Sequence, residues 1–378
     1  MVEVLMDAPR RIAVWNTAFL GDAVLTLPLI RTLRAAWPDA ALDFYVRGGL
    51  APLFAAQPEI DAVYAYDKRG SAQGPSGFWL LSREVAARRY DMWIDAHLSL
   101  RSSLMARLSG APRRVGYAEA SLAWWLFTDQ VGRRFVERQE IERLLGLLEP
   151  LNLPPAVLED ESLRWPELSL PVDALAEAER LLAPLPPGPV LGVHPGSVWP
   201  TKRWTPEGFA LVLRRALEAG ACAVVLASPD ESDAAREVLR LAGDMGDGRP
   251  LTRAAEGPGG TSRLLDLAGR TSLPVLAAVL GRLQCYLTND SGPMHLAWAQ
   301  RTPVTALFGP TVRGLGFAPR GAAATVMEVD EPCRPCGLHG HKTCPRGHFR
   351  CMRALDPEAV WRDVRAKLYP WRAEERAP

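Results

Sequence analysis

The sequence lacks a long hydrophobic run. No segment reaches the ~18 uninterrupted apolar residues of a membrane-spanning helix, and residues 1–10 hold no apolar stretch that would form the core of a signal peptide. We therefore expect a cytoplasmic protein whose contact with any membrane is peripheral.

An excess of charge of either sign is also absent. The 44 Lys and Arg residues nearly balance the 43 Asp and Glu residues, which leaves a net charge of +1. Proteins dedicated to nucleic-acid binding usually carry a strong basic excess. We therefore expect no nucleic-acid partner.

The chain does have enough apolar residues for two domains. It has 378 residues, 48% of them hydrophobic, and chains of this length usually divide. Strand-like runs alternate with helical patterns in both halves, which predicts an α/β fold built of βαβ units with parallel sheets. A segment rich in Pro and acidic residues, 151–170, connects the halves.

We predict an N-terminal domain, 1–168, a C-terminal domain, 169–355, and a last helical segment, 356–378, with packing back on the N-terminal domain as one arrangement. The predicted strands cover 11–16, 41–46, 62–66, 92–96, 114–117, 190–194, 221–227, 284–288 and 304–308, the predicted helices include 22–37, 207–219, 230–242, 273–280, 293–299 and 357–367, and a loop is expected at 243–262.

Three loops that follow predicted strands carry residues suited to chemistry. The first, 16–22, has the strand–turn–helix order of a phosphate cradle, but it lacks the full glycine fingerprint and ends in Asp22. Two interpretations of Asp22 remain open. It caps the following helix, or its carboxylate acts as a general base in a cleft.

The second loop, 193–204, combines small and hydroxyl residues with a lysine. Its backbone N–H groups and Ser197 are suited to donate hydrogen bonds to a diphosphate, and the Lys202 ammonium to neutralise the charge. A surface loop with a solvated lysine is the alternative.

The third loop, 287–295, runs from a strand end into a helix that begins near Pro293. The N-terminus of such a helix presents free N–H groups and positive potential to an anion, and His295 in the first turn adds a donor. The alternative is an ordinary capped helix with an incidental histidine.

These motifs together resemble the bacterial glycosyltransferase family 9, whose best-known members are the ADP-heptose:lipopolysaccharide heptosyltransferases. The resemblance covers residues 11 to about 361 and rests mainly on the order and spacing of two motifs, Asp-Ser-Gly-Pro-x-His at 290–295 and Phe-Gly-Pro-Thr at 308–311. Gly-Asp at 21–22 and the His-Pro-Gly-Ser and Lys-x-Trp pair within 194–204 add to it.

The resemblance implies a GT-B fold, in which two Rossmann-like domains face each other across a cleft and the C-terminal domain binds a nucleotide-diphosphate sugar. It implies inverting transfer without a catalytic metal or other cofactor: heptose, from ADP-heptose, moves to a lipopolysaccharide-core or related acidic glycolipid at the cytoplasmic face of the inner membrane. By motif, Asp22 matches the catalytic base, Lys202 a lysine on the donor phosphates, and Glu231 lies near the ribose-binding glutamate. The donor-binding residues are then Ser197, Lys202, Glu231, Asn289, Asp290, Ser291, Gly292 and His295.

Arginines gather between residues 96 and 134, where only two acidic residues lie. Either they are ordinary solvated side chains, or Arg101, Arg113 and Arg114 form a cationic face for an acidic glycolipid acceptor. Trp124 and Trp125 either stack on sugar or touch lipid headgroups, or they belong to the core.

Three other functions fit parts of the pattern. A GT-B-like sugar-nucleotide epimerase would form product without an acceptor, and a non-catalytic sugar-nucleotide-binding protein would not need Asp22. A nicotinamide oxidoreductase would need the G-x-G-x-x-G fingerprint and a ribose-binding acid, both of which the first loop lacks.

Four of the six cysteines cluster near the C-terminus, as Cys333, Cys336, Cys344 and Cys351, while the other two sit singly in apolar stretches. In a cytoplasmic protein such a cluster favours a metal over disulfides. Four thiolates match structural zinc, although the second pair is more widely spaced than usual. A histidine of the same segment, His339, His341 or His348, is an alternative ligand to one of the cysteines. An iron–sulfur cluster is the less favoured metal, and free or paired thiols are the alternative to any metal.

Overall fold

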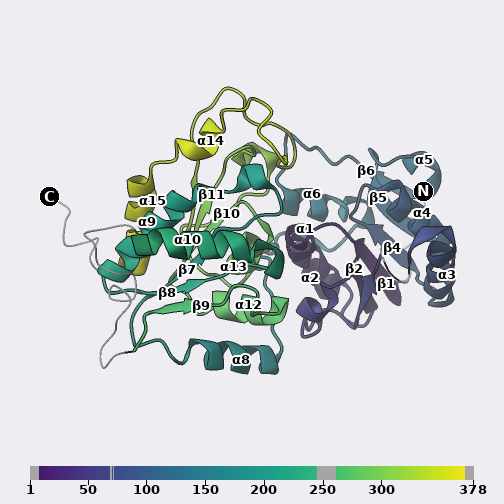
Figure 1. Ribbon diagram of the computed structural model, residues 1–378. Helices are drawn as coiled ribbons and strands as arrows, with labels where there is room; N and C mark the ends of the chain where they lie inside the picture. Colours follow the sequence, from purple (N-terminus) through teal and green to yellow (C-terminus); the bar gives the residue numbers. More distant parts are fainter. Residues whose placement is uncertain (1–7, 69, 71, 245–260, 371–378) are drawn as a thin grey trace. The chain divides into compact units, whose positions relative to one another are not determined.

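The computed structural model describes residues 8–68, 70, 72–244 and 261–370 (Figure 1). The chain divides into two compact units, Met1–Leu170 and Pro171–Pro378. Each unit contains one six-stranded sheet whose neighbouring strands are parallel. The predicted fold class, two Rossmann-like α/β units of the GT-B kind, is confirmed.

The sheet of the first unit has the strand order β3-β2-β1-β4-β5-β6. The chain starts at the centre, builds outward to one edge, and then returns to build the other half, so the order reverses between β1 and β4. The strands are β1 (Arg11–Asn16), β2 (Ala41–Arg47), β3 (Ala62–Tyr66), β4 (Met92–Asp95), β5 (Arg113–Tyr117) and β6 (Asp129–Val131), and the helices are α1 (Leu20–Leu25), α2 (Leu27–Ala36), α3 (Gly74–Ala87), α4 (Leu100–Leu108), α5 (Ala123–Leu126), α6 (Glu140–Gly146) and α7 (Pro155–Leu158).

The second unit repeats this topology with the order β12-β11-β10-β7-β8-β9, which reverses between β7 and β10. Ligands of doubly wound sheets bind at such a reversal, beyond the carboxyl ends of the strands. The strands are β7 (Val190–His194), β8 (Cys222–Val225), β9 (Leu264–Asp266), β10 (Cys285–Asn289), β11 (Val304–Leu307) and β12 (Ala324–Met327), and the helices are α8 (Val172–Leu182), α9 (Pro206–Glu218), α10 (Ser232–Asp244), α12 (Leu273–Leu280), α13 (Gly292–Ala299), α14 (Arg350–Arg353) and α15 (Pro357–Leu368).

The central strands are nearly continuous apolar runs because helices cover both faces of a parallel sheet. In β1, Ile12, Ala13 and Val14 are all fully buried. In β10, Cys285 and Leu287 are fully buried and belong to the core of the second unit. This burial fixes the strand ends from which the functional loops leave.

The last helix packs within the second unit, and its return to the N-terminal domain stays a prediction. Residues of α15, including Val360, Trp361 and Val364, lie in the core of the second unit, where α15 packs against α9, β10 and β11. The apolar face of this helix is therefore used within its own unit.

The predicted helix over 22–37 is two helices, α1 and α2, that meet at Thr26. Pro28 has no N–H to donate to the carbonyl of Val24, so the hydrogen-bond ladder breaks there. Next to this break, the carbonyl of Asp22 accepts hydrogen bonds from the Thr26 hydroxyl and the Asn16 amide.

Of the predicted loop at 243–262, residues 245–260 lie outside the described part of the chain. Within that part, no helix is both long and apolar enough to cross a membrane.

Candidate functional site

The loops that follow β7, β10 and β11 leave the same edge of the second sheet, since these strands are parallel neighbours. Two of them are the predicted phosphate loops, and they are joined by Asn289 at the end of β10. Its amide nitrogen donates to the carbonyls of Pro195 (2.9 Å) and Gly196 (3.0 Å), and its amide oxygen accepts from the N–H of Trp204 (2.9 Å). Asn289 is fully buried and therefore positions the loop around Lys202.

Lys202 and Asp290 form an ion pair at the carboxyl end of β10. Lys202 Nζ lies 2.6 Å from Asp290 Oδ2, and the Thr311 hydroxyl donates to the same oxygen at 2.6 Å. The Lys202 and Asp290 side chains are 12% and 8% exposed. The ammonium is thus fixed next to α13 in a side chain that is not fully buried.

The N-terminus of α13 lies just after Asp290 in the chain. Ser291 precedes it in extended conformation without a side-chain capping bond, and Gly292 and Pro293 are the first helical residues. Free N–H groups at such a terminus, together with the helix dipole, favour an anion. The ammonium of Lys202 adds positive charge at the same place.

His295 lies in the first turns of α13 and is 4% exposed. Burial, and then the positive charge of Lys202, lower its pKa to about 4, although Asp290 opposes the shift. His295 is therefore neutral near pH 7. Its buried Nδ1 has no hydrogen-bond partner among the described residues.

Glu231 follows β8, on the other side of β7. Its Oε2 contacts His194 Nε2 at 3.3 Å and accepts from the Ser228 hydroxyl at 2.9 Å. Burial would raise the pKa of Glu231, but His194 and Ser228 dominate and lower it to about 2. A Cβ on Gly196 would come within 2.6 Å of the Glu231 carboxylate, so the β7 loop needs a glycine there. The structure thus places an ionised carboxylate beside the second predicted loop.

Ser197 is buried and partly engaged within its own loop. Its hydroxyl accepts a long hydrogen bond of 3.4 Å from the N–H of Trp199, and its carbonyl accepts from Arg203 Nε at 2.8 Å. The hydroxyl proton remains free to donate to a bound anion.

Asp22 lies in α1, directly after β1 and next to the reversal of the first sheet. Its carboxylate accepts a hydrogen bond from the N–H of Phe19 at 3.1 Å, which is a capping contact. Burial, and then the negative charge of Glu140, raise the pKa of Asp22 to about 6. A carboxyl group with this pKa can accept a proton near neutral pH. The two interpretations of Asp22 are therefore compatible.

Two charged residues that act on Asp22, Glu140 and Arg133, were not predicted as site residues from the sequence. Arg133 donates to both carboxylate oxygens of Glu140, at 2.8 and 2.9 Å, and Arg143 donates to Glu140 at 2.7 Å. The Glu140 and Arg143 side chains are 3% and 0% exposed. Glu140 raises the pKa of Asp22 and Arg133 lowers it. A glutamate at a helix start looks like an ordinary capping residue, so the sequence carried no signal for this role.

Asp95 is the last residue of β4 and His97 follows the strand, across the reversal from β1. Asp95 is buried, and this burial raises its pKa well above the ordinary value. Its Oδ1 accepts from the N–H of His97 at 3.1 Å, and His97 Nδ1 lies 3.1 Å from the Thr17 hydroxyl. Burial also lowers the pKa of His97 to about 4. Burial therefore favours the uncharged forms of Asp95 and His97 beside the Asp22 carboxyl.

The three arginines predicted to bind the acceptor have internal partners. Arg101 donates to the carbonyl of Ala72, Arg113 pairs with Asp129 at 3.3 Å, and the Arg114 Nε donates to the carbonyl of Leu126 at 2.9 Å. These contacts hold β5, α4 and neighbouring loops in place. The acceptor role of the three arginines stays a prediction.

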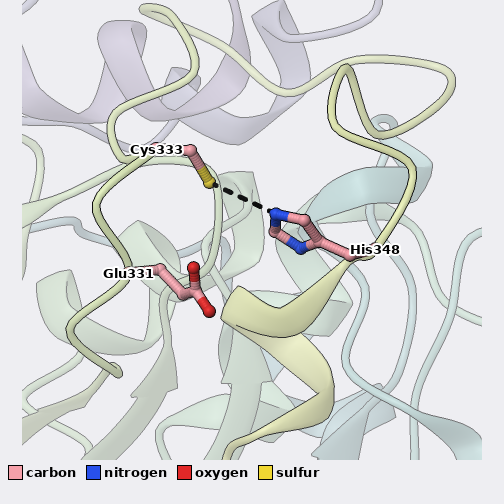
Figure 2. A group of neighbouring side chains, drawn as sticks. All are labelled: Glu331, Cys333 and His348. Carbon is pink, nitrogen blue, oxygen red and sulfur yellow. Dashed lines mark hydrogen bonds between the residues drawn. The ribbon is translucent and has the colours of Figure 1, made fainter.

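The four clustered cysteines lie on the segment that follows β12. Cys333, Cys336 and Cys344 are half-buried, Cys351 is buried, and all are free thiols. In the described part of the chain, the group of metal-binding side chains whose ligand atoms lie within 4.8 Å of one another is Glu331, Cys333 and His348, which includes one of the four cysteines. Figure 2 shows the His348 ring turned toward the Cys333 sulfur.

Known proteins share both this sequence pattern and this fold. The family model of glycosyltransferase family 9 (heptosyltransferase) matches residues 78–346. Lipopolysaccharide heptosyltransferase 2 of Escherichia coli (strain K12) is 24% identical over 307 residues, which cover 80% of this chain and 83% of that protein.

Two solved structures share the fold across nearly the whole chain. One is the glycosyl transferase family 9 protein from Veillonella parvula DSM 2008, with a TM-score of 0.80, 24% identity, and coverage of 97% of this chain and 98% of that one. The other is the E. coli ADP-heptose lps heptosyltransferase II, with a TM-score of 0.73, 23% identity, and coverage of 97% and 100%.

Proposed function

This chain belongs to glycosyltransferase family 9, the heptosyltransferases, and from that premise we propose that it moves heptose from ADP-heptose to a lipopolysaccharide-core or related acidic glycolipid, with inversion at the anomeric carbon. The names of its relatives point to this donor and this acceptor class. The observation that carries the proposal is the partly buried ion pair of Lys202 and Asp290 at the N-terminus of α13.

The diphosphate of the donor binds between Lys202 and the first turn of α13. The fixed ammonium and the free N–H groups supply positive potential where a nucleoside diphosphate leaves. Catalysis by this arrangement needs no metal ion, because Lys202 and the helix terminus offset the developing charge. Ser197 and His295 add hydrogen bonds, and Glu231 accepts from a ribose hydroxyl.

Asp22 is the base. As the acceptor hydroxyl oxygen bonds to the anomeric carbon, the bond from that carbon to the phosphate oxygen breaks, and the hydroxyl proton passes to the Asp22 carboxylate. ADP departs from the opposite face, so the configuration inverts. A carboxyl pKa of about 6 suits this transfer near neutral pH.

A lipid-linked acceptor requires contact with a membrane surface. Trp124 and Trp125 on α5 are 75% and 52% exposed, and Leu108 at the end of the neighbouring α4 is 44% exposed. Arg107 on α4 is also exposed. Burial, and then the positive charge of Arg107, lower the pKa of Arg114. Exposed tryptophans with cations suit an anionic bilayer surface. We assign this surface to peripheral contact with the cytoplasmic face of the inner membrane.

The test is a transfer assay with purified protein, ADP-heptose and a heptose-deficient lipopolysaccharide core, with the product followed by mass spectrometry. The proposal predicts an acceptor heavier by one heptose and one equivalent of ADP. A panel of UDP, GDP and CMP sugars serves as the control for donor choice. Conversion of ADP-heptose without acceptor would indicate an epimerase, and binding without conversion a non-catalytic protein; either result contradicts the proposal.

A further inference from the structure

His194 lies at the centre of the site where we place the donor. It is the last residue of β7, and β7 lies between β8 and β10 in the second sheet (Figure 1). The register of the strands places His194 beside Thr288 of β10. Glu231 lies after β8, and α13 begins soon after β10. His194 is therefore at the reversal of the sheet, with the Glu231 loop on one side and α13 on the other.

The orientation of the imidazole is fixed by its neighbours. His194 is 3% exposed, and its ring lies nearly parallel to the ring of Tyr286, with the centroids 6.4 Å apart. Its Nε2 lies 3.3 Å from Glu231 Oε2, and its Nδ1 lies 3.5 Å from the Thr288 hydroxyl. A carboxylate only accepts hydrogen bonds, so Nε2 carries the proton and donates to Glu231.

The internal contacts of Glu231 use one carboxylate oxygen. Oε2 accepts from His194, from the Ser228 hydroxyl at 2.9 Å and from the Ser228 N–H at 3.4 Å. Among the described residues, none donates a hydrogen bond to Oε1. A Cβ on Gly196 would lie 2.6 Å from Oε2, so the β7 loop also covers that oxygen. Oε1 is therefore the oxygen left to accept from a ligand.

The same contacts keep the carboxylate charged. Burial would raise the pKa of Glu231, but His194, and then Ser228, lower it to about 2. Hydrogen bonds to an ionised acceptor are among the stronger ones in proteins. An acceptor that is already oriented also loses less entropy when a ligand binds. Glu231 is thus prepared to accept a hydrogen bond from a hydroxyl group.

We propose that His194 is a positioning residue that makes the donor site selective for ribose over deoxyribose. Its Nε2–H holds Glu231 Oε2 and thereby directs Oε1 to a ribose hydroxyl of the nucleotide. His194 itself touches neither the sugar nor the reacting atoms. The inference rests on the proposed function, in which Glu231 accepts from a ribose hydroxyl.

The contacts of His194 toward α13 are longer and less direct. The Thr288 hydroxyl, 3.5 Å from His194 Nδ1, lies 3.4 Å from the Ser291 hydroxyl, and Ser291 precedes α13. Loss of the Nε2 donor should therefore disturb the ribose contact more than the binding of the diphosphate. A nucleotide without ribose hydroxyls should bind almost as well to a His194 variant as to wild type.

Isothermal calorimetry with ADP and with dideoxy-ADP, which lacks both ribose hydroxyls, measures this selectivity. Wild type should bind ADP about 10- to 100-fold more tightly, the range of one hydrogen bond to a charged group. His194→Gln keeps an N–H donor at the place of Nε2 and should retain this ratio. The amide of His194→Asn corresponds to Nδ1 instead, so this variant should lower the ratio to within about threefold. Both variants should bind dideoxy-ADP within about threefold of wild type.

Two further variants separate positioning from general damage. Tyr286→Phe keeps the ring beside His194 and should retain the wild-type ratio. Glu231→Ala removes the acceptor and should lose the ratio, and His194→Asn added to it should change nothing further, because His194 acts through Glu231. Folding is checked by circular dichroism, and His194→Phe takes the place of His194→Asn if the latter does not fold.

Three results contradict the inference alone: a wild-type ratio in folded His194→Asn, the same loss of ratio in His194→Gln as in His194→Asn, or equal weakening of both nucleotides in His194→Asn. Wild type that binds ADP and dideoxy-ADP equally contradicts the role of Glu231 in the proposed function, and this inference with it.

Discussion

Asp290 Oδ2 accepts from Lys202 Nζ at 2.6 Å, across 88 positions of sequence. The Thr311 hydroxyl reaches the same oxygen, so one carboxylate oxygen joins the loops after β7, β10 and β11. Charge-assisted hydrogen bonds of this kind are among the stronger ones in proteins. The lysine that we propose to bind the donor is therefore held in place before any donor arrives.

Lys202→Ala should weaken binding of ADP about 10- to 100-fold and leave adenosine binding within about twofold, because a hydrogen bond to a charged group is worth about 1.5–3 kcal/mol. Isothermal calorimetry measures both ligands. Lys342→Ala, on an exposed lysine of the cysteine-rich segment, is the matched control and should bind like wild type. Equal losses for ADP and adenosine would show that Lys202 does not contact the diphosphate.

The acceptor kcat/KM should depend on pH through Asp22. Its pKa is raised to about 6, so the base form predominates above pH 6 and the rate should reach a plateau there. Below pH 6 the rate should fall about tenfold per pH unit, since only the ionised form accepts a proton. A rate that stays constant down to pH 5 would exclude this group as the base.

The same shift has a consequence for stability. Because the folded pKa lies above the ordinary value of 3.8, folded Asp22 keeps its proton to higher pH than the unfolded chain, and stability declines as pH rises from about 4 to 6. Asp22→Asn should therefore melt at a higher temperature than wild type at pH 8, with the difference vanishing below pH 4. A lower melting temperature for the variant at pH 8 would contradict the raised pKa.

Glu140→Gln should move the acidic limb of the pH profile to lower pH. Glu140 raises the pKa of Asp22, and its loss also frees Arg133, which lowers that pKa further. The buried Arg143 loses its partner as well, which typically costs about 3–5 kcal/mol, so folding is checked by circular dichroism and Glu140→Asp is made in parallel. The control is Glu142→Gln on the same helix, which should leave the limb in place. A limb that stays at pH 6 in folded Glu140→Gln would contradict the coupling.

The double variant Trp124→Ala and Trp125→Ala should weaken binding to anionic lipid vesicles about tenfold, because burial of each indole contributes roughly 25 cal/mol per Å². Vesicle co-sedimentation gives the affinity, and transfer to a water-soluble core oligosaccharide should be unchanged. Val172→Ala, at an exposed apolar residue of α8, is the control. Equal loss of transfer to lipid-linked and soluble acceptors would place these tryptophans in sugar binding.

Much of the fold can be predicted from the sequence. The central strands are buried on both faces, so each consists of a run of apolar residues that is recognisable in the sequence. The strands that escaped prediction, β6, β9 and β12, lie at sheet edges and have only three or four residues. Residues of β9 are at most half-buried. An edge strand is held mainly by its backbone partner, which lies elsewhere in the chain and leaves no local pattern.

The candidate site, like the fold, has residues that the sequence predicts and contacts that it does not. The sequence predicts Asp22, Lys202 and Asp290 as site residues because each lies in a local motif next to a strand end. The contact of Thr201 with His341 spans 140 positions, and such pairs are set by topology rather than by any local pattern. The internal partners of Arg113 could not be predicted either, because a cluster of arginines in the sequence looks alike whether the side chains bind a ligand or other residues of the chain.

The central claim is that Asp22 accepts the proton of the acceptor hydroxyl while the C-terminal unit holds the donor. Single-turnover transfer from ADP-heptose by wild type and Asp22→Asn, at donor concentrations saturating by calorimetry, tests it most directly. We predict equal ADP affinity and a transfer rate lowered about 100- to 10,000-fold in Asp22→Asn, the range typical of a lost general base. Transfer within about tenfold of wild type would contradict the account.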